Sequence, residues 1–202
     1  MTDNDPRTRL GLTSKASDED VESAHRNVVS FLESQHRQVK AMFATVLSAR
    51  GDARAQAFYA LRRMLAVHET AEEEIVHPAA RKALPDGDEI VAARLAEENE
   101  AKRALTELEK LEVDSPEFVT KLRILQANVI AHAESEEEEE FARLAGLLDQ
   151  GRLERMRKAA ELAESIAPTR PHAGIESATA NILVGPFASM VDRSRDVLSR
   201  KS

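Results

Sequence analysis

Apolar residues recur at steps of three and four along most of the chain, which is the spacing of one face of an α-helix. Four long segments show this pattern, and turn signals such as Arg50-Gly-Asp and Leu84-Pro-Asp-Gly-Asp separate them. Ser115 followed by Pro116 is a typical helix start. The pattern predicts helices from Ser17 or Asp18 to about Ala49, from Ala53 to Leu84, from Asp86 or Asp88 through Leu108, and from Ser115 through Leu147.

Four helices of similar length with short connections are typical of an antiparallel up-down-up-down four-helix bundle, so we predict an all-α fold with additional C-terminal helices. A shorter fifth helix is predicted from about Arg152 to Ile166, and two prolines and a glycine make residues 167–174 a linker. The final apolar stretch is expected to dock on the bundle or on another subunit. The predicted organisation is a flexible N-terminal tail (1–16), the bundle (17–148) and a C-terminal helical extension (149–202).

Composition narrows the classes of function. The 202 residues include no cysteine, so thiolate nucleophiles, disulfides and cysteine-ligated metals are excluded. The formal net charge is −8 with basic residues scattered among acidic ones, which disfavours nucleic acid as a partner. No apolar run approaches the length of a membrane span and the N-terminal residues have no signal-peptide core, so we expect a cytoplasmic protein without a membrane partner.

Polar residues that can bind metal interrupt the apolar stripe of each bundle helix. The second and fourth helices share the motif HxxxE, whose two side chains lie one above the other on the same helix face. These candidate metal ligands are His36 on the first helix, His68 and Glu72 on the second, Glu98 on the third, and His132 and Glu136 on the fourth.

Burying three carboxylates and three imidazoles is unfavourable unless the groups are paired, neutralised or bound to metal. Any one of these histidines, taken alone, is more often a hydrogen-bonded core residue than a ligand. An ion-pair network is a second alternative, but Lys102 is the one basic residue on the four stripes and it cannot balance three carboxylates. A group of cations accounts for all six residues together.

Several neighbouring residues have other expected roles. Glu69 adjoins His68 and is a further candidate ligand, whereas His77 lies one position out of phase and is assigned to the surface or to contact with a ligand. In the run from Glu136 to Glu140, only the two end residues keep the phase of the stripe. The remaining glutamates are expected to face solvent.

This arrangement resembles the hemerythrin-like (HHE cation-binding) family over about residues 20–148, including "HETAEEEIVHPA" and "HAESEEEEEFARL". The resemblance implies a four-helix bundle with two non-haem iron ions bound by His36, His68, His132, Glu72 and Glu136. Family members commonly show "LAEH" on the third helix, where this chain reads "LAEE", so Glu98 stands in the place of a histidine. Replacing imidazole by anionic oxygen favours Fe(III), and hard N/O ligands also suit manganese.

These observations lead us to expect a diiron protein that binds or turns over a small diatomic or peroxide ligand, such as O₂, hydrogen peroxide or NO, rather than one that carries O₂ reversibly. Two alternatives stay open: an iron- or oxygen-responsive sensor without turnover, and a metal-free structural bundle. Whether the chain is an enzyme is also open. A homodimer formed through the C-terminal extension is a further expectation.

Overall fold

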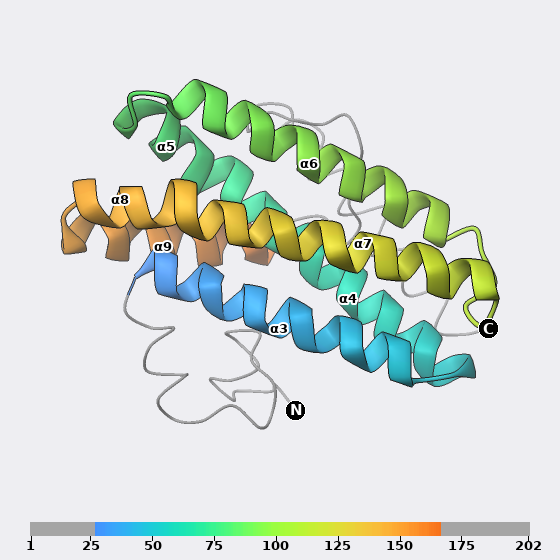
Figure 1. Ribbon diagram of the computed structural model, residues 1–202. Helices are drawn as coiled ribbons and strands as arrows, with labels where there is room; N and C mark the ends of the chain where they lie inside the picture. Colours follow the sequence, from blue (N-terminus) through green and yellow to red (C-terminus); the bar gives the residue numbers. More distant parts are fainter. Residues whose placement is uncertain (1–26, 167–202) are drawn as a thin grey trace, which may run out of the picture.

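The computed structural model describes residues 27–166, which are almost entirely helical (Figure 1). The prediction of an all-α fold is therefore confirmed. The described helices are α3 (Val28–Ser48), α4 (Gly51–Ala71), η1 (Glu72–Val76), α5 (His77–Ala83), α6 (Gly87–Leu108), α7 (Pro116–Ser135), η2 (Glu136–Phe141), α8 (Ala142–Leu147) and α9 (Gln150–Ile166). None of these helices has the combination of length and apolarity that crossing a bilayer requires.

Four long rods form the predicted antiparallel bundle, in which α3 packs on α4 and on α7, and α6 packs on α7 (Figure 1). The second rod is continuous from α4 through η1 to α5, and the fourth from α7 through η2 to α8. The predicted fifth helix is present as α9, which packs against α3 and α4. The N-terminal tail, the linker and the final apolar stretch lie outside the described residues.

Local hydrogen bonds explain where two of the helices begin. Asn27 has an extended backbone (φ −158°, ψ −179°), and its side chain and the backbone of Ser30 form one half of a reciprocal capping box. The predicted start of this helix near Ser17 is therefore wrong, because the helix begins at Val28. The predicted start at Ser115 is confirmed, since its hydroxyl accepts a hydrogen bond from the backbone N–H of Phe118.

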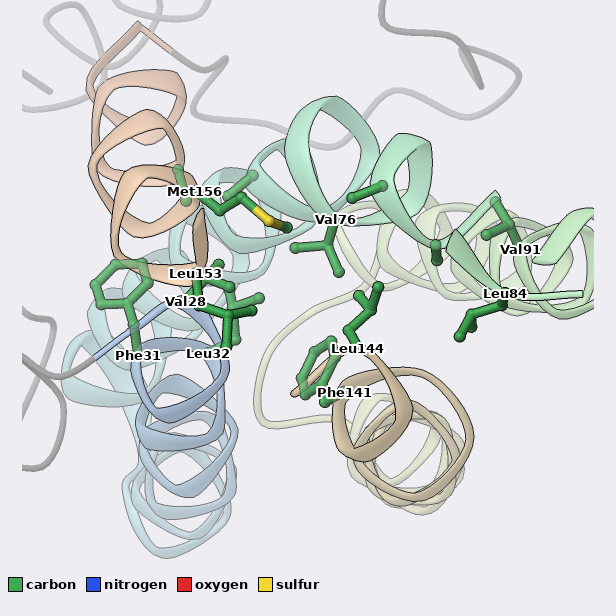
Figure 2. Close-up of a cluster of buried hydrophobic side chains, with 14 of the residues drawn as sticks. Val28, Phe31, Leu32, Val76, Leu84, Val91, Phe141, Leu144, Leu153 and Met156 are labelled. Atoms are coloured by element: carbon green, nitrogen blue, oxygen red, sulfur yellow. The ribbon is translucent and has the colours of Figure 1, made fainter. Parts of the chain in front are cut away.

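The core consists of two apolar clusters at opposite ends of the bundle. The first includes Val28, Phe31, Leu32, Val76, Leu84, Val91, Phe141, Leu144, Leu153 and Met156, contributed by several helices including α9 (Figure 2). The second comprises Val39, Phe43, Val46, Phe58, Leu61, Leu65, Leu105, Leu108, Phe118, Leu122, Leu125 and Val129. Each long rod contributes to both clusters, so burial of apolar surface fixes the rods side by side over their whole length.

Between these clusters lies a layer of polar residues, which we call the polar layer: His36, His68, Glu72, Glu98, His132 and Glu136. On α3 the layer falls between Leu32 of the first cluster and Val39 of the second. The order reverses on α4, as it must in an antiparallel bundle. Every rod therefore presents its polar residues at the same height.

Two π-helical turns, η1 and η2, begin at Glu72 and Glu136 of the polar layer. In η1 the N–H of His77 donates to the carbonyl of Glu72, five residues earlier. Such a turn contains one residue more than an α-helical turn and shifts the following side chains around the axis. Pro78, which has no N–H to donate, follows η1 within the first turn of α5 and does not end the rod.

The shift in register corrects two predicted core positions. A constant helical period counted from His68 and Glu72 predicts that Ile75 faces the core, but Ile75 is only half-buried and Val76 is buried in its place. The same period predicts that Leu147 faces the core on the fourth helix, yet its side chain is 60% exposed, whereas Phe141 is fully buried. A constant period of 3.6 residues fails at these positions because each π turn adds a residue to the count.

Candidate metal centre

The Nε2 atoms of three histidines point at the carboxylates of Glu72 and Glu136. His36 Nε2 lies 3.4 Å from Glu136 Oε2 and 3.7 Å from Glu72 Oε1. His68 Nε2 is 3.3 Å from Glu72 Oε1, and His132 Nε2 is 3.2 Å from Glu136 Oε1. Three of the six predicted ligands thus surround the carboxylates of two others, Glu72 and Glu136.

The residues of this group fit a bound cation. Glu72 and Glu136 are both 0% exposed. Within residues 27–166, all four of their carboxylate oxygens are without a hydrogen-bond partner, as are Nε2 of His36 and of His132. Unpartnered buried carboxylates are costly and rare in folded proteins. Ligand atoms from His36, His68, Glu72 and Glu136 all lie within 4.8 Å of one another, so a single cation can satisfy them together.

The opposite nitrogen of each histidine, Nδ1, contacts a side-chain oxygen of the protein. When Nδ1–H donates to an acceptor, Nε2 carries the free lone pair that a metal needs. The Nδ1 contacts are each 2.8 Å long and join His36 to Glu137 Oε1, His68 to Gln35 Oε1 and His132 to Glu97 Oε2.

The contact to His68 continues to the fifth helix. Gln35 accepts at Oε1 from His68 and donates from Nε2 to Glu164 Oε1 of α9, at 2.8 Å. An amide has distinct donor and acceptor ends, so the carboxylate of Glu164 holds the acceptor end of Gln35 toward His68. Helix α9 therefore contributes to the orientation of a candidate ligand.

Glu98 belongs to the polar layer but has different partners. Its Oε1 lies 2.8 Å from His77 Nε2, and its Oε2 accepts from Lys102 Nζ at 3.2 Å. Its carboxylate also lies near His132 and Glu136, in a second group of three whose ligand atoms are all within 4.8 Å of each other. The structure thus brings Glu98 to the site while engaging both of its oxygens with protein groups.

Further buried polar residues surround Glu98 that the helical period did not select. His77, assigned to the surface or to contact with a ligand, is 1% exposed and lies between Glu98 and Glu140, with its Nδ1 3.0 Å from Glu140 Oε1. Glu69, left open as a ligand, is buried next to Lys102. The signal for His77 is its spacing of five residues from Glu72, which a π turn brings onto the same face.

Burial and mutual repulsion alter the pKa values of the groups in the metal-free chain. Burial, and then the charge of Glu136, raise the pKa of Glu72 to about 8. Burial alone would lower the pKa of His36, but its contacts with Glu136, Glu137 and Glu72 hold it well above the ordinary value. The metal-free site thus retains protons near neutral pH, and a cation has to displace them.

Two pockets reach the polar layer on either side of α7. One of about 190 Å³ lies between α3, α4 and α7 and is lined by His36, His68, His132 and the apolar residues Val39, Leu65 and Val129. The other, of about 220 Å³, lies between α6 and α7 and is lined by Glu69, Glu97, Glu98 and His132. Small molecules can therefore approach the candidate ligands without opening the bundle.

Comparisons with known proteins agree with this geometry. The family described as hemerythrin HHE cation binding domain matches residues 27–144, which is more than half of the chain. A crystal structure of a hemerythrin HHE cation binding domain-containing protein from Mycobacterium kansasii superposes with a TM-score of 0.62 at 18% identity, covering 69% of this chain and 85% of that one. This likeness supports the fold.

A curated relative is also similar in sequence. A DNA nickase from Nostoc sp. is 26% identical over 117 residues, which make up 57% of this chain and 33% of that protein. The chain thus spans about a third of the length of this relative. Together with the His/Glu groups of the polar layer, the family match over residues 27–144 shows that the chain belongs to the hemerythrin HHE cation-binding family.

Proposed function

We propose that the polar layer binds two iron ions and that the loaded site binds or turns over a small oxidant such as O₂, hydrogen peroxide or NO. The observation that carries the proposal is the set of unpartnered buried atoms on Glu72, Glu136, His36 and His132. A nitrogen and oxygen donor set with no sulfur suits iron and also manganese. Three candidate groups share Glu136, and the two ions are expected at two of them: His36, His68, Glu72 and Glu136, and Glu98, His132 and Glu136.

When bound, iron supplies one- and two-electron redox chemistry. The residues of the chain hold the ions, orient the imidazoles through their Nδ1 contacts, and limit access to small molecules. The pocket between α3, α4 and α7 combines apolar walls at Val39, Leu65 and Val129 with the histidines of the layer, which suits a small uncharged ligand. Glu98 in place of a histidine supports redox turnover or sensing over reversible O₂ carriage, because anionic oxygen stabilises Fe(III).

A sensor without turnover is the second candidate, and the hydrogen bonds to α9 favour it. His68 is joined through Gln35 to Glu164, near the end of α9 and shortly before residues 167–202. A change at the metal site can therefore alter the packing of α9. Nicking of DNA, the activity in the name of the Nostoc protein, is disfavoured for this chain, because the chain covers a third of that protein and carries a net charge of −8.

The experiment that tests the proposal is metal analysis of the full chain, purified after growth with iron, combined with assays of peroxide and NO decay. We expect about two iron ions per chain, absorption in the near-ultraviolet and visible, and decay of at least one oxidant faster than with free iron. His68→Ala should lose iron and the absorption together. A full chain with no bound iron or manganese would contradict the proposal, and stable binding without decay would favour the sensor.

A further inference from the structure

A lysine ammonium already lies among the carboxylates on one side of the polar layer. Lys102 on α6 is 5% exposed, and its Nζ lies 3.2 Å from Glu98 Oε2 and 3.7 Å from Glu69 Oε2. It also forms an ion pair with Glu73. Oxygens from these three glutamates lie within 4.8 Å of one another, close enough to hold a metal ion by themselves. The ammonium thus occupies a position that a cation would otherwise favour.

On the other side of the layer, no described residue supplies such an internal cation. Among residues 27–166, the cationic or potentially cationic partners of Glu72 and Glu136 are histidines, and both carboxylates keep unpartnered oxygens. A metal ion bound by His36, His68, Glu72 and Glu136 therefore meets no competing ammonium from the described part of the chain. The two halves of the layer differ in the charge they offer to a cation.

The second half cannot be loaded without involving Lys102. Its candidate ligands are His132, Glu136 and Glu98, and Glu98 Oε2 is the atom that accepts from the ammonium. A second ion must either share this carboxylate with Lys102 or displace the contact. Either case places two positive charges close together in a buried site, where salt and solvent screen them poorly.

We propose that Lys102 acts as a built-in counter-cation that makes metal loading sequential. The first ion binds to His36, His68, Glu72 and Glu136, and the second binds more weakly beside His132 and Glu98. This inference rests on the proposed metal site and concerns the order and relative strength of binding. Before the second ion binds, Lys102 compensates the charge of Glu69, Glu73 and Glu98. Its positive charge then lowers the affinity for that ion.

The test is an anaerobic titration of the metal-free full chain with Fe(II), followed by calorimetry and by iron analysis after gel filtration. The wild-type chain should show two binding events that differ in affinity by about tenfold or more, equivalent to about 1.4 kcal/mol. In Lys102→Met the second event should tighten by about tenfold or more. The first event should change far less, because no ligand of the first ion contacts Lys102.

A charge series separates this role from a general effect of mutation. Glu73→Gln, which removes a negative charge next to Lys102, should weaken the second event, and Lys102→Arg should keep the wild-type order. Lys121→Met is the matched control, since Lys121 pairs with Glu107 at the surface. If Lys102→Met does not fold, the double variant Lys102→Met/Glu73→Gln keeps the local charge unchanged and should bind the second ion about as the wild type does.

Two results distinguish failure of this inference from failure of the proposed function. Two ions bound with equal affinity by the wild type, or a second affinity unchanged in Lys102→Met, would overturn the role of Lys102 while leaving the metal site intact. No iron binding by the wild type would overturn both.

Discussion

At the scale of single residues, side chains two positions apart in one acidic run have different environments. Glu136 is fully buried and belongs to three of the candidate metal groups, whereas Glu138 is exposed. Between them, Glu137 reaches Nδ1 of His36. The chemistry of this run therefore depends on which helix face each glutamate occupies, and mutations within it have different expected effects.

Glu136→Gln tests the ligand assignment with little change in shape. The amide carries no negative charge, so the affinity for Fe(II) should fall by about 100-fold or more, beyond the range typical of residues that only support ligands. Glu138→Gln, in the same run, should bind iron like the wild type. Calorimetric titration of both variants provides the measurement, and an equal loss in both would refute the distinction between them.

The sequence could assign those site residues that follow the helical period of their own helix. His36, His68, Glu72, Glu98, His132 and Glu136 lie on the apolar stripe of their own helices, and the structure brings all six into one layer. The partners of the histidine Nδ1 atoms could not be assigned from the sequence, because they come from neighbouring helices. Their selection depends on how the helices are rotated against one another, which a single-helix pattern does not contain.

At the scale of elements, the π turns determine which residues join the site. Each begins at a glutamate of the polar layer. Because the turn holds one extra residue, the side chains after it are rotated around the helix axis relative to a uniform α-helix. His77 enters the interior for this reason, as does Phe141. Sequence periodicity predicts a uniform helix and cannot locate an inserted residue. The predicted stripe is therefore correct up to each turn, whereas from the turn onward it is correct at Leu144 but wrong at Ile75 and Leu147.

Helix α9 lies beyond the matched family region, and its contribution to the site can be tested through Glu164. Glu164→Leu removes the acceptor that orients Gln35, so the affinity for the first iron ion should fall by about tenfold. Burial raises the pKa of Glu164 to about 7 despite its hydrogen bond from Gln35, so a neutral glutamine is a close substitute. Glu164→Gln should therefore retain most of the wild-type affinity.

A second readout separates orientation from packing in these variants. Nitrogen NMR of the metal-free chain reports which ring nitrogen of His68 carries the proton. Glu164→Leu should increase the fraction protonated at Nε2, and Glu164→Gln should not. Glu154→Gln, an exposed position of α9, serves as the control. A change in affinity without a change in this tautomer would mean that α9 acts only through packing.

At the scale of the whole molecule, a charged layer separates two apolar clusters that would otherwise be continuous. The clusters provide the hydrophobic driving force for folding, and the layer opposes it in the metal-free chain because its charges are buried. Binding of a cation by the folded state alone should stabilise the bundle. Stability should therefore depend on metal and on protons together.

The metal-free protein should lose stability as the pH rises from about 6.5 to 8. Over this range the folded state holds protons that the unfolded chain has released. Burial and the charge of Glu136 raise the pKa of Glu72 to about 8. Burial and the charge of Glu98 raise the pKa of Glu73 to about 7. Burial lowers the pKa of His68 to about 3, which makes stability rise with pH, but only below about pH 6.5. The loss from Glu72 alone is on the order of 2 kcal/mol.

Chemical unfolding at several pH values measures this effect, and Glu72→Gln should flatten the dependence. With iron bound, the stability should instead increase with pH, because the metal competes with protons for the same groups and binds more tightly as the pH rises. A metal-free wild type whose stability increases from pH 6.5 to 8 would contradict the protonation states inferred for the layer.

The account as a whole depends on cations being bound in the polar layer, and crystals of the iron-loaded full chain test this most directly. Diffraction data collected on both sides of the iron absorption edge locate iron independently of the protein. We predict two anomalous peaks within bonding distance of the layer, the stronger next to His36, His68, Glu72 and Glu136 and the other next to His132. The absence of any peak among these residues in iron-loaded crystals would contradict the central claim.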